Sequence, residues 1–101
     1  MNNKYIEQLH KLVINFLAAY NVRIYLYGSH AKGTAHKTSD VDIAILPKGK
    51  IPKDLFSRLR EAIEESTIPY NVDVTDLTQV SDEFRRQILK DAILWKDYNK
   101  E

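Results

Sequence analysis

The apolar residues of this chain follow two different spacings in alternating segments, and the order of these segments limits the folds that the chain can adopt. Apolar residues recur every three or four positions in three segments, which predicts helices, and every second position in the segments between them, which predicts strands. The expected order is α-β-β-α-β-α-β, with a short helical turn and a loop after the first strand. This order predicts a small α/β (α+β) fold in which helices pack on a mixed β-sheet. The helices are expected to begin at Asn2 or Asn3, Pro52 and Ser81, and the strands to cover residues 22–27, 41–46 and 70–75. Residues 92–95 can prolong the last helix or form a short closing strand, and the strand is favoured.

Size and composition predict a small single-domain protein without disulfides or a membrane span. Its 101 residues suit one domain, residues 1–101, and 44% of them are hydrophobic, enough for a modest core. The 15 Lys and Arg residues nearly balance the 14 Asp and Glu residues, so direct nucleic-acid binding through bulk charge is not expected. Cysteine is absent, which excludes disulfides and thiolate metal sites. No stretch resembles a membrane span or a signal peptide, so a cytoplasmic protein is expected.

Two acidic residues stand at the start of the apolar strand predicted at residues 41–46: Asp40 directly precedes it and Asp42 is its second residue. Alternate residues of a strand project from the same face, about 6.5–7 Å apart. Burying two carboxylates together is costly because like charges repel and both groups lose water, unless a cation or hydrogen-bond donors compensate. The pair therefore predicts a divalent-cation site. Asp73, which lies between two valines of the next predicted strand, is a candidate third carboxylate.

A second polar segment directly follows the first predicted strand. Gly28 allows a sharp turn and the close approach of a ligand, and Ser29 adds a hydroxyl donor. Lys32 adds a positive charge one turn later, and Gly33 lets the chain bend away. This composition predicts a phosphate cradle, although it lacks the P-loop signature. A phosphate cradle beside paired carboxylates is the combination that metal-assisted phosphoryl or nucleotidyl transfer requires.

The three segments together resemble the nucleotidyltransferase superfamily that includes DNA polymerase beta, and more narrowly the minimal nucleotidyltransferases of bacteria and archaea. The resemblance covers nearly the whole chain. It is carried by Gly-Ser-His-Ala-Lys-Gly at residues 28–33, Ser-Asp-Val-Asp-Ile-Ala-Ile at residues 39–45 and Val-Asp-Val at residues 72–74.

This resemblance implies a Mg²⁺-dependent enzyme that transfers a nucleoside monophosphate, with ATP as the expected donor. It implies that Gly28 and Ser29 bind the triphosphate, with Lys32 and Gly33 beside them. Asp40, Asp42 and Asp73 would form the catalytic triad and hold metal, with two Mg²⁺ ions expected. The expected acceptor is a tyrosine hydroxyl of a helical HEPN-domain toxin, for which the chain would be the antitoxin. At this length the extra domains of larger relatives are not expected, which argues against a polymerase or a drug-modifying role.

Other interpretations of the same residues stay open. The domain can neutralise a HEPN partner by contact alone, with nucleotide bound but not turned over. It can also sense a nucleotide without chemistry, or lack a ligand altogether. An isolated Asp-x-Asp sequence is most often a solvated turn, and Gly28-Ser29 alone is an ordinary turn; it is their combination with Asp73 that favours a nucleotide or metal site.

Overall fold

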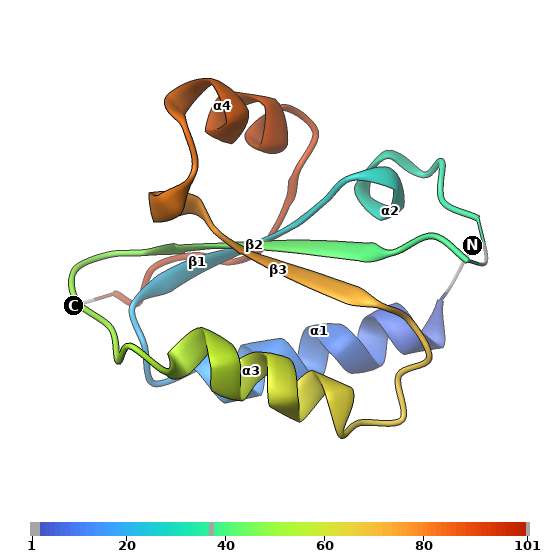
Figure 1. Ribbon diagram of the computed structural model, residues 1–101, viewed down its shortest axis with the longest axis horizontal. Coiled ribbons are helices and arrows are strands. Elements are labelled where there is room, and N and C mark those ends of the chain that lie inside the picture. Colours follow the sequence, from blue (N-terminus) through green and yellow to red (C-terminus); the bar gives the residue numbers. More distant parts are fainter. Residues whose placement is uncertain (1–2, 37, 101) are drawn as a thin grey trace.

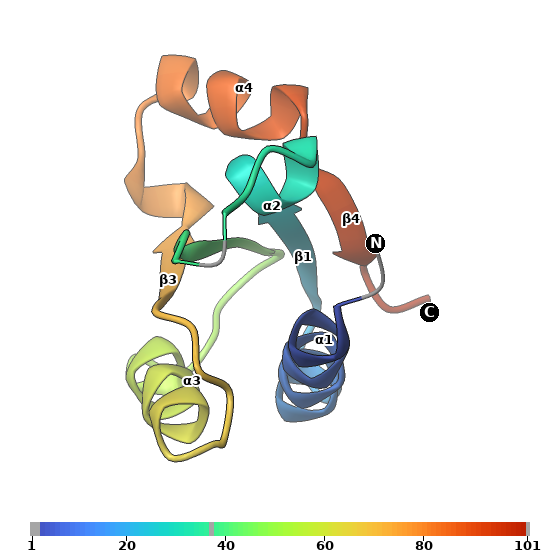
Figure 2. The same ribbon diagram turned by 90° about the vertical axis from the view of Figure 1, so that its right-hand side faces the viewer.

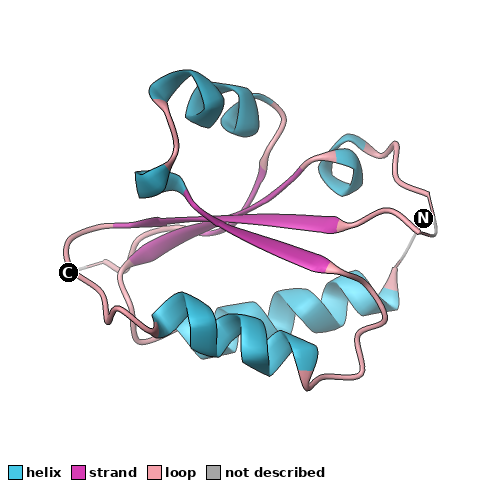
Figure 3. Cartoon of the chain, viewed as in Figure 1, coloured by secondary structure: helices cyan, strands magenta, loops and turns pink. Residues whose placement is uncertain are grey.

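The computed structural model describes residues 3–36 and 38–100, which form a mixed β-sheet with helices on both faces (Figures 1 and 3). The fold class and the order of elements predicted from the sequence are confirmed, including a strand as the last element. The elements are α1 (Lys4–Leu17), β1 (Val22–Tyr27), α2 (Ser29–Lys32), β2 (Val41–Pro47), α3 (Leu55–Glu64), β3 (Val72–Asp76), the 3₁₀ turn η1 (Leu77–Gln79), α4 (Asp82–Lys90) and β4 (Ile93–Lys96).

Strand order in the sheet is β3-β2-β1-β4. β1 is antiparallel to both β2 and β4, whereas β2 and β3 run parallel, with α3 as the connection between them. The register places Asp42 opposite Tyr27 on one side and opposite Asp73 on the other. Because register partners project from the same face of a sheet, these three side chains share one face.

Helices α1 and α3 lie side by side under one face of the sheet (Figures 1 and 2). Their apolar stripes pack against the alternate strand residues that face them, as the two hydrophobic periods predict. This main core consists of Leu9, Val13, Leu17, Val22, Ile24, Leu26, Val41, Ile43, Ile45, Leu55, Leu59, Ile63 and Val74.

The opposite face of the sheet is covered by η1 and α4, where Ala44, Leu77 and Ile88 form a second, smaller core cluster. Tyr25 and Tyr27 pack against this cluster, as their alternation with the main-core residues predicts. Asp40 and Asp73 lie exposed at the end of this face where β2 and β3 begin. The fold thus pairs one fully covered face with one that leaves polar residues accessible.

Helix boundaries depart from the sequence expectations in places. Asn3 caps α1 by accepting from the amides of Tyr5 and Ile6, whereas Asn2 lies outside the described residues. The sequence predicts Asn21 as the residue that ends this helix, but Asn21 lies three residues beyond the Ala18 cap.

Pro52 does not begin α3, which starts at Leu55 after a turn in which the Leu55 amide donates to the Pro52 carbonyl. Strand β3 starts at Val72 rather than at residue 70.

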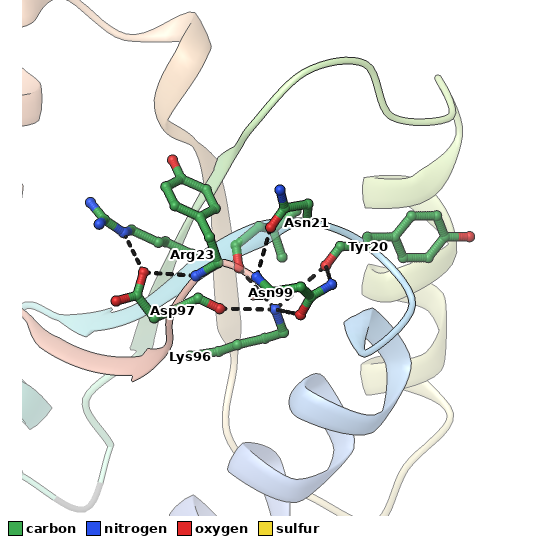
Figure 4. Close-up of polar contacts among 8 residues, drawn as sticks. Tyr20, Asn21, Arg23, Lys96, Asp97 and Asn99 are labelled. Carbon is green, nitrogen blue, oxygen red and sulfur yellow. Dashed lines mark hydrogen bonds and ion pairs between the residues drawn. The ribbon is translucent and has the colours of Figure 1, made fainter. Parts of the chain in front are cut away.

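The last residues are fastened to the start of β1 by a cluster of polar contacts (Figure 4). The Lys96 ammonium donates to the carbonyls of Tyr20 and Val22 and to the Asn99 side chain, at 3.4, 3.2 and 2.9 Å. Arg23 and Asp97 form an ion pair of 2.7 Å. These contacts hold the edge strand β4 beside β1, whose other end leads into the candidate site.

Candidate active site

The predicted carboxylates gather at the end of the sheet where β2 and β3 begin. Asp42 and Asp73 are register partners on adjacent parallel strands. Asp40 precedes β2 by one residue and lies two positions before Asp42, so it continues the same alternation. Period-two reasoning alone pairs Asp40 with Asp42; it is the parallel pairing of β2 with β3 that brings Asp73 alongside.

Asp42 is the carboxylate whose ionisation the fold perturbs. Its side chain is half-buried, and this burial raises the pKa of Asp42 above its ordinary value. The neighbouring charges of Asp73 and Asp40 raise it further, while nearby His30 acts in the opposite direction. The charged form of Asp42 is therefore disfavoured unless a positive charge compensates it.

This perturbation predicts a pH-dependent effect of an Asp42→Asn substitution on the stability of the metal-free protein. A carboxyl whose pKa is raised by folding stabilises the protein fully below its unfolded value, about 3.9, and loses that contribution as pH rises through the folded pKa. The variant is not subject to this loss. We therefore expect Asp42→Asn to melt a few degrees above the wild type at pH 7, and the difference to shrink as the solution is acidified towards pH 4.

Thermal unfolding in a chelating buffer measures this difference, with Asp76→Asn as the control. Asp76 accepts a hydrogen bond from the Thr78 amide as the cap of η1, and asparagine retains that role. A wild-type protein that melts above the Asp42→Asn variant at pH 7 contradicts the expectation.

Gly28 forms the turn between β1 and α2, directly beside Asp42. Its φ of +75° lies in the left-handed region that L residues rarely adopt. A Cβ atom at this position would collide with the Asp42 Oδ2 and would lie 3.2 Å from the Asp42 Cγ. The predicted turn thus exists, and only glycine allows it to lie against the carboxylate.

The other residues of the predicted phosphate cradle come directly after Gly28 in the chain. Ser29 begins α2 and Lys32 ends it, with the Lys32 side chain exposed. Gly33 ends the helix in a left-handed conformation, and its amide donates to the Ser29 carbonyl. The four residues Gly28, Ser29, Lys32 and Gly33 therefore lie within one tight turn beside the carboxylate cluster.

Sequence reasoning assigned no role to His30, which the structure brings to this site. The His30 Nε2 lies 3.3 Å from the Ser39 carbonyl oxygen, and its ring meets the Tyr70 ring edge-on with 5.3 Å between centroids. His30 is also the neighbour that opposes the rise in the Asp42 pKa. His30 lies near Asp42 because the turn at residues 28–33 folds back over β2. No local sequence pattern predicts this arrangement.

Tyr27 and Thr75 support the carboxylates from within the sheet. The Tyr27 hydroxyl and the Thr75 Oγ1 are 3.0 Å apart and share a hydrogen bond. Burial first, and then the charges of Asp42 and Asp73, raise the pKa of Tyr27, while the Thr75 hydrogen bond lowers it. Tyr27 therefore stays a neutral hydroxyl next to acidic neighbours.

The donor set fits a hard divalent cation that its substrate helps to bind. Carboxylate oxygens suit Mg²⁺, which proteins hold with one or two carboxylates together with substrate phosphates. Within residues 3–36 and 38–100, no three acidic or histidine side chains converge on one ready-made cation position. The close pair Asp42 and Asp73, whose mutual repulsion raises the Asp42 pKa, fits a cation whose remaining ligands would come from a phosphate-bearing molecule.

None of the helices in the described part of the chain is long and apolar enough to cross a membrane.

Comparison with known proteins places this chain in a family. The model of the family "Polymerase beta, Nucleotidyltransferase" matches residues 11–101. Over 77 residues the chain is 35% identical to a Haemophilus influenzae protein named probable protein adenylyltransferase MntA; the match covers 76% of this chain and 68% of that protein.

Solved structures share the fold. A chain in the crystal structure of a toxin–antitoxin with AMP-PNP matches with a TM-score of 0.71 and 26% identity, over 87% of this chain and 73% of that one. A structure of a tri-AMPylated Shewanella oneidensis HEPN toxin in complex with an MNT antitoxin matches with a TM-score of 0.60 and 21% identity, over 90% and 71% of the two chains. The second likeness shows the fold alone. Because the family model spans most of the chain, including the Gly28 turn and all three aspartates, this protein belongs to the polymerase beta nucleotidyltransferase family.

Proposed function

We propose that this protein transfers AMP from ATP to a hydroxyl group of a HEPN-type toxin, most simply a tyrosine, and thereby acts as its antitoxin. The observation that carries the proposal is the juxtaposition of Asp42 and Asp73, as register partners, beside the Gly28 turn. The 35% identity to an adenylyltransferase supports AMP as the transferred group.

The turn that contains Gly28 and Ser29 would hold the triphosphate of ATP. Gly28 exposes backbone without a side chain, so phosphate oxygens can approach the amides of the turn. The Ser29 hydroxyl donates to a phosphate oxygen, and the exposed Lys32 ammonium adds positive charge at the outer side of the turn. Gly33 ends the turn, and the space beside it is open, since a Cβ atom there would meet nothing within 4 Å.

Asp40, Asp42 and Asp73 are the residues that would hold Mg²⁺, with two ions expected from the resemblance. Bound there, Mg²⁺ would neutralise charge on the phosphates and favour attack on the α-phosphorus. Asp73 is the exposed carboxylate of the pair, and we assign it the proton of the attacking hydroxyl. The hydroxyl oxygen forms a bond to the α-phosphorus, the bond from that phosphorus to the bridging oxygen breaks, and pyrophosphate leaves.

The molecules named with the solved relatives support the choice of acceptor. One matching structure is a toxin–antitoxin pair with AMP-PNP, and another pairs an MNT antitoxin with a HEPN toxin that carries three AMP groups. A hydroxyl acceptor on a folded partner also suits the open position of Asp40 and Asp73 at the end of the sheet, since a large substrate can reach them.

Incubation with ATP labelled on the α-phosphate, Mg²⁺ and a HEPN protein encoded next to this one tests the proposal. We expect label on the HEPN protein and release of pyrophosphate, both abolished by EDTA. Mass spectrometry of the labelled protein then locates the modified side chain. Intact ATP and unlabelled partner after long incubation, with the partner nevertheless neutralised, would instead support antitoxin action by contact alone.

A further inference from the structure

A hollow of about 140 Å³ opens beside the Gly28 turn, and none of the roles proposed above uses it. Its near side is formed by Tyr27, Gly28 and Lys32, at the end of β1 and along α2. Its far side is formed by α4, which lies on the same side of the sheet as α2 (Figure 2). The hollow is therefore continuous with the turn that would hold the phosphates.

Phe84 gives this hollow an aromatic surface. The sequence predicts Phe84 as an inner-face residue of α4, but the structure corrects this: its side chain is 47% exposed and lines the hollow. Ile88 and Tyr27 add apolar surface beside it. An exposed ring next to apolar neighbours offers a stacking surface for a flat, weakly polar group.

Hydrogen-bonding groups line the same hollow. Gln87 lies on α4 and Asp91 is the residue that caps its C-terminal end; both are exposed and line the hollow. Gln87 follows Phe84 by three residues, which puts these two on one helical face, and Asp91 lies at the end of that face. This face presents a ring, an amide and a carboxylate towards the Gly28 turn.

We propose that this hollow binds the adenine base of the nucleotide donor. Phe84 stacks on the base, the Asp91 carboxylate accepts from the 6-amino group, and the Gln87 amide donates to a ring nitrogen. This inference rests on the proposed function, because a base placed here requires its phosphates at the Gly28 turn. It assigns α4 the role of selecting the nucleotide, whereas the carboxylates of β2 and β3 carry the transfer.

Calorimetry with two ligands tests the base assignment in the presence of Mg²⁺. The ligands are α,β-methylene-ATP, which cannot be turned over at the α-phosphate, and inorganic tripolyphosphate, which has no base. We expect Phe84→Ala to weaken binding of the nucleotide by about tenfold and to leave tripolyphosphate binding unchanged, since loss of stacking affects the base alone. Phe84→Tyr should restore nucleotide binding, and Glu83→Ala, an exposed neighbour outside the hollow, should not alter either affinity.

A base analogue tests the polar contacts. Purine ribonucleoside triphosphate lacks the 6-amino group, so the wild type should bind it about tenfold more weakly than ATP, and Asp91→Ala should abolish this preference.

The outcomes separate the two proposals. If the wild type binds the nucleotide but Phe84→Ala binds it equally well, or loses both ligands alike, the base does not occupy this hollow. If the wild type binds neither the nucleotide nor tripolyphosphate, the phosphate cradle and the proposed function fail, and the base assignment falls with them.

Discussion

An Asp42→Ala variant is expected to lose AMP transfer by about a hundredfold or more, because a metal-held phosphoryl site draws several kcal/mol of transition-state stabilisation from its ion. Asp42 is the most enclosed of the three carboxylates and lies between Tyr27 and Asp73 in the register. Its removal relieves repulsion rather than breaking an ion pair, so the variant should stay folded. The measurement is the initial rate of label transfer from ATP to the HEPN partner at fixed Mg²⁺.

Asp76→Asn is the matched control, since Asp76 lies on the same strand as Asp73 but caps η1 instead of facing the site. It should transfer AMP at the wild-type rate. Titration of the toxin adds a second readout: an enzyme neutralises many equivalents of toxin, and Asp42→Ala should not. Full catalytic neutralisation by Asp42→Ala would remove Asp42 from the reaction, and neutralisation by both proteins at one equivalent would favour the contact-only interpretation.

The sequence predicts which strands carry the acidic residues but not which acidic residues meet. Alternation within one strand is a local property, so Asp40 and Asp42 can be paired from spacing alone. The meeting of Asp42 with Asp73 depends on β2 and β3 being adjacent and parallel, which α3 makes possible by crossing under the sheet. The family resemblance predicts that Asp73 joins Asp40 and Asp42, whereas hydrophobic periodicity alone does not predict it.

Helix α4 shows a different limit of sequence reasoning. Its apolar period predicts Phe84 and Ile88 on one buried face, and Ile88 is buried while Phe84 is exposed. The period identifies a face but not how much of it the sheet covers. The same period predicts that Arg85 faces solvent, but Arg85 donates to the Leu77 carbonyl at 2.7 and 3.1 Å and holds η1 against the helix. Phe84 is exposed because the sheet does not cover this part of the helix face, and Arg85 is held because η1 lies beside α4; both are tertiary properties.

A Gly28→Ala variant is expected to lose both stability and transfer activity, and Gly49→Ala offers a close control. Both glycines have a positive φ, +75° and +82°, so alanine pays the same left-handed strain at each, about 1–2 kcal/mol. They differ in their surroundings. A Cβ atom at Gly49 meets nothing within 4 Å, whereas one at Gly28 collides with the Asp42 carboxylate. Strain alone therefore acts at Gly49, and strain plus displacement of the Asp42 carboxylate acts at Gly28.

The two variants should consequently differ more in their rate of AMP transfer than in their melting temperature. Each kcal/mol corresponds to about 4–8 °C in a domain of this size, so Gly49→Ala should melt several degrees below the wild type and still transfer AMP at the wild-type rate when assayed well below its melting temperature. Gly28→Ala should melt lower still and should transfer AMP at least about tenfold more slowly under the same conditions, because a misplaced carboxylate no longer holds its charge where the α-phosphate reacts. Equal rates for the two variants would mean that Asp42 accommodates the added methyl group, and the close approach of the turn to the carboxylate would then have no catalytic importance.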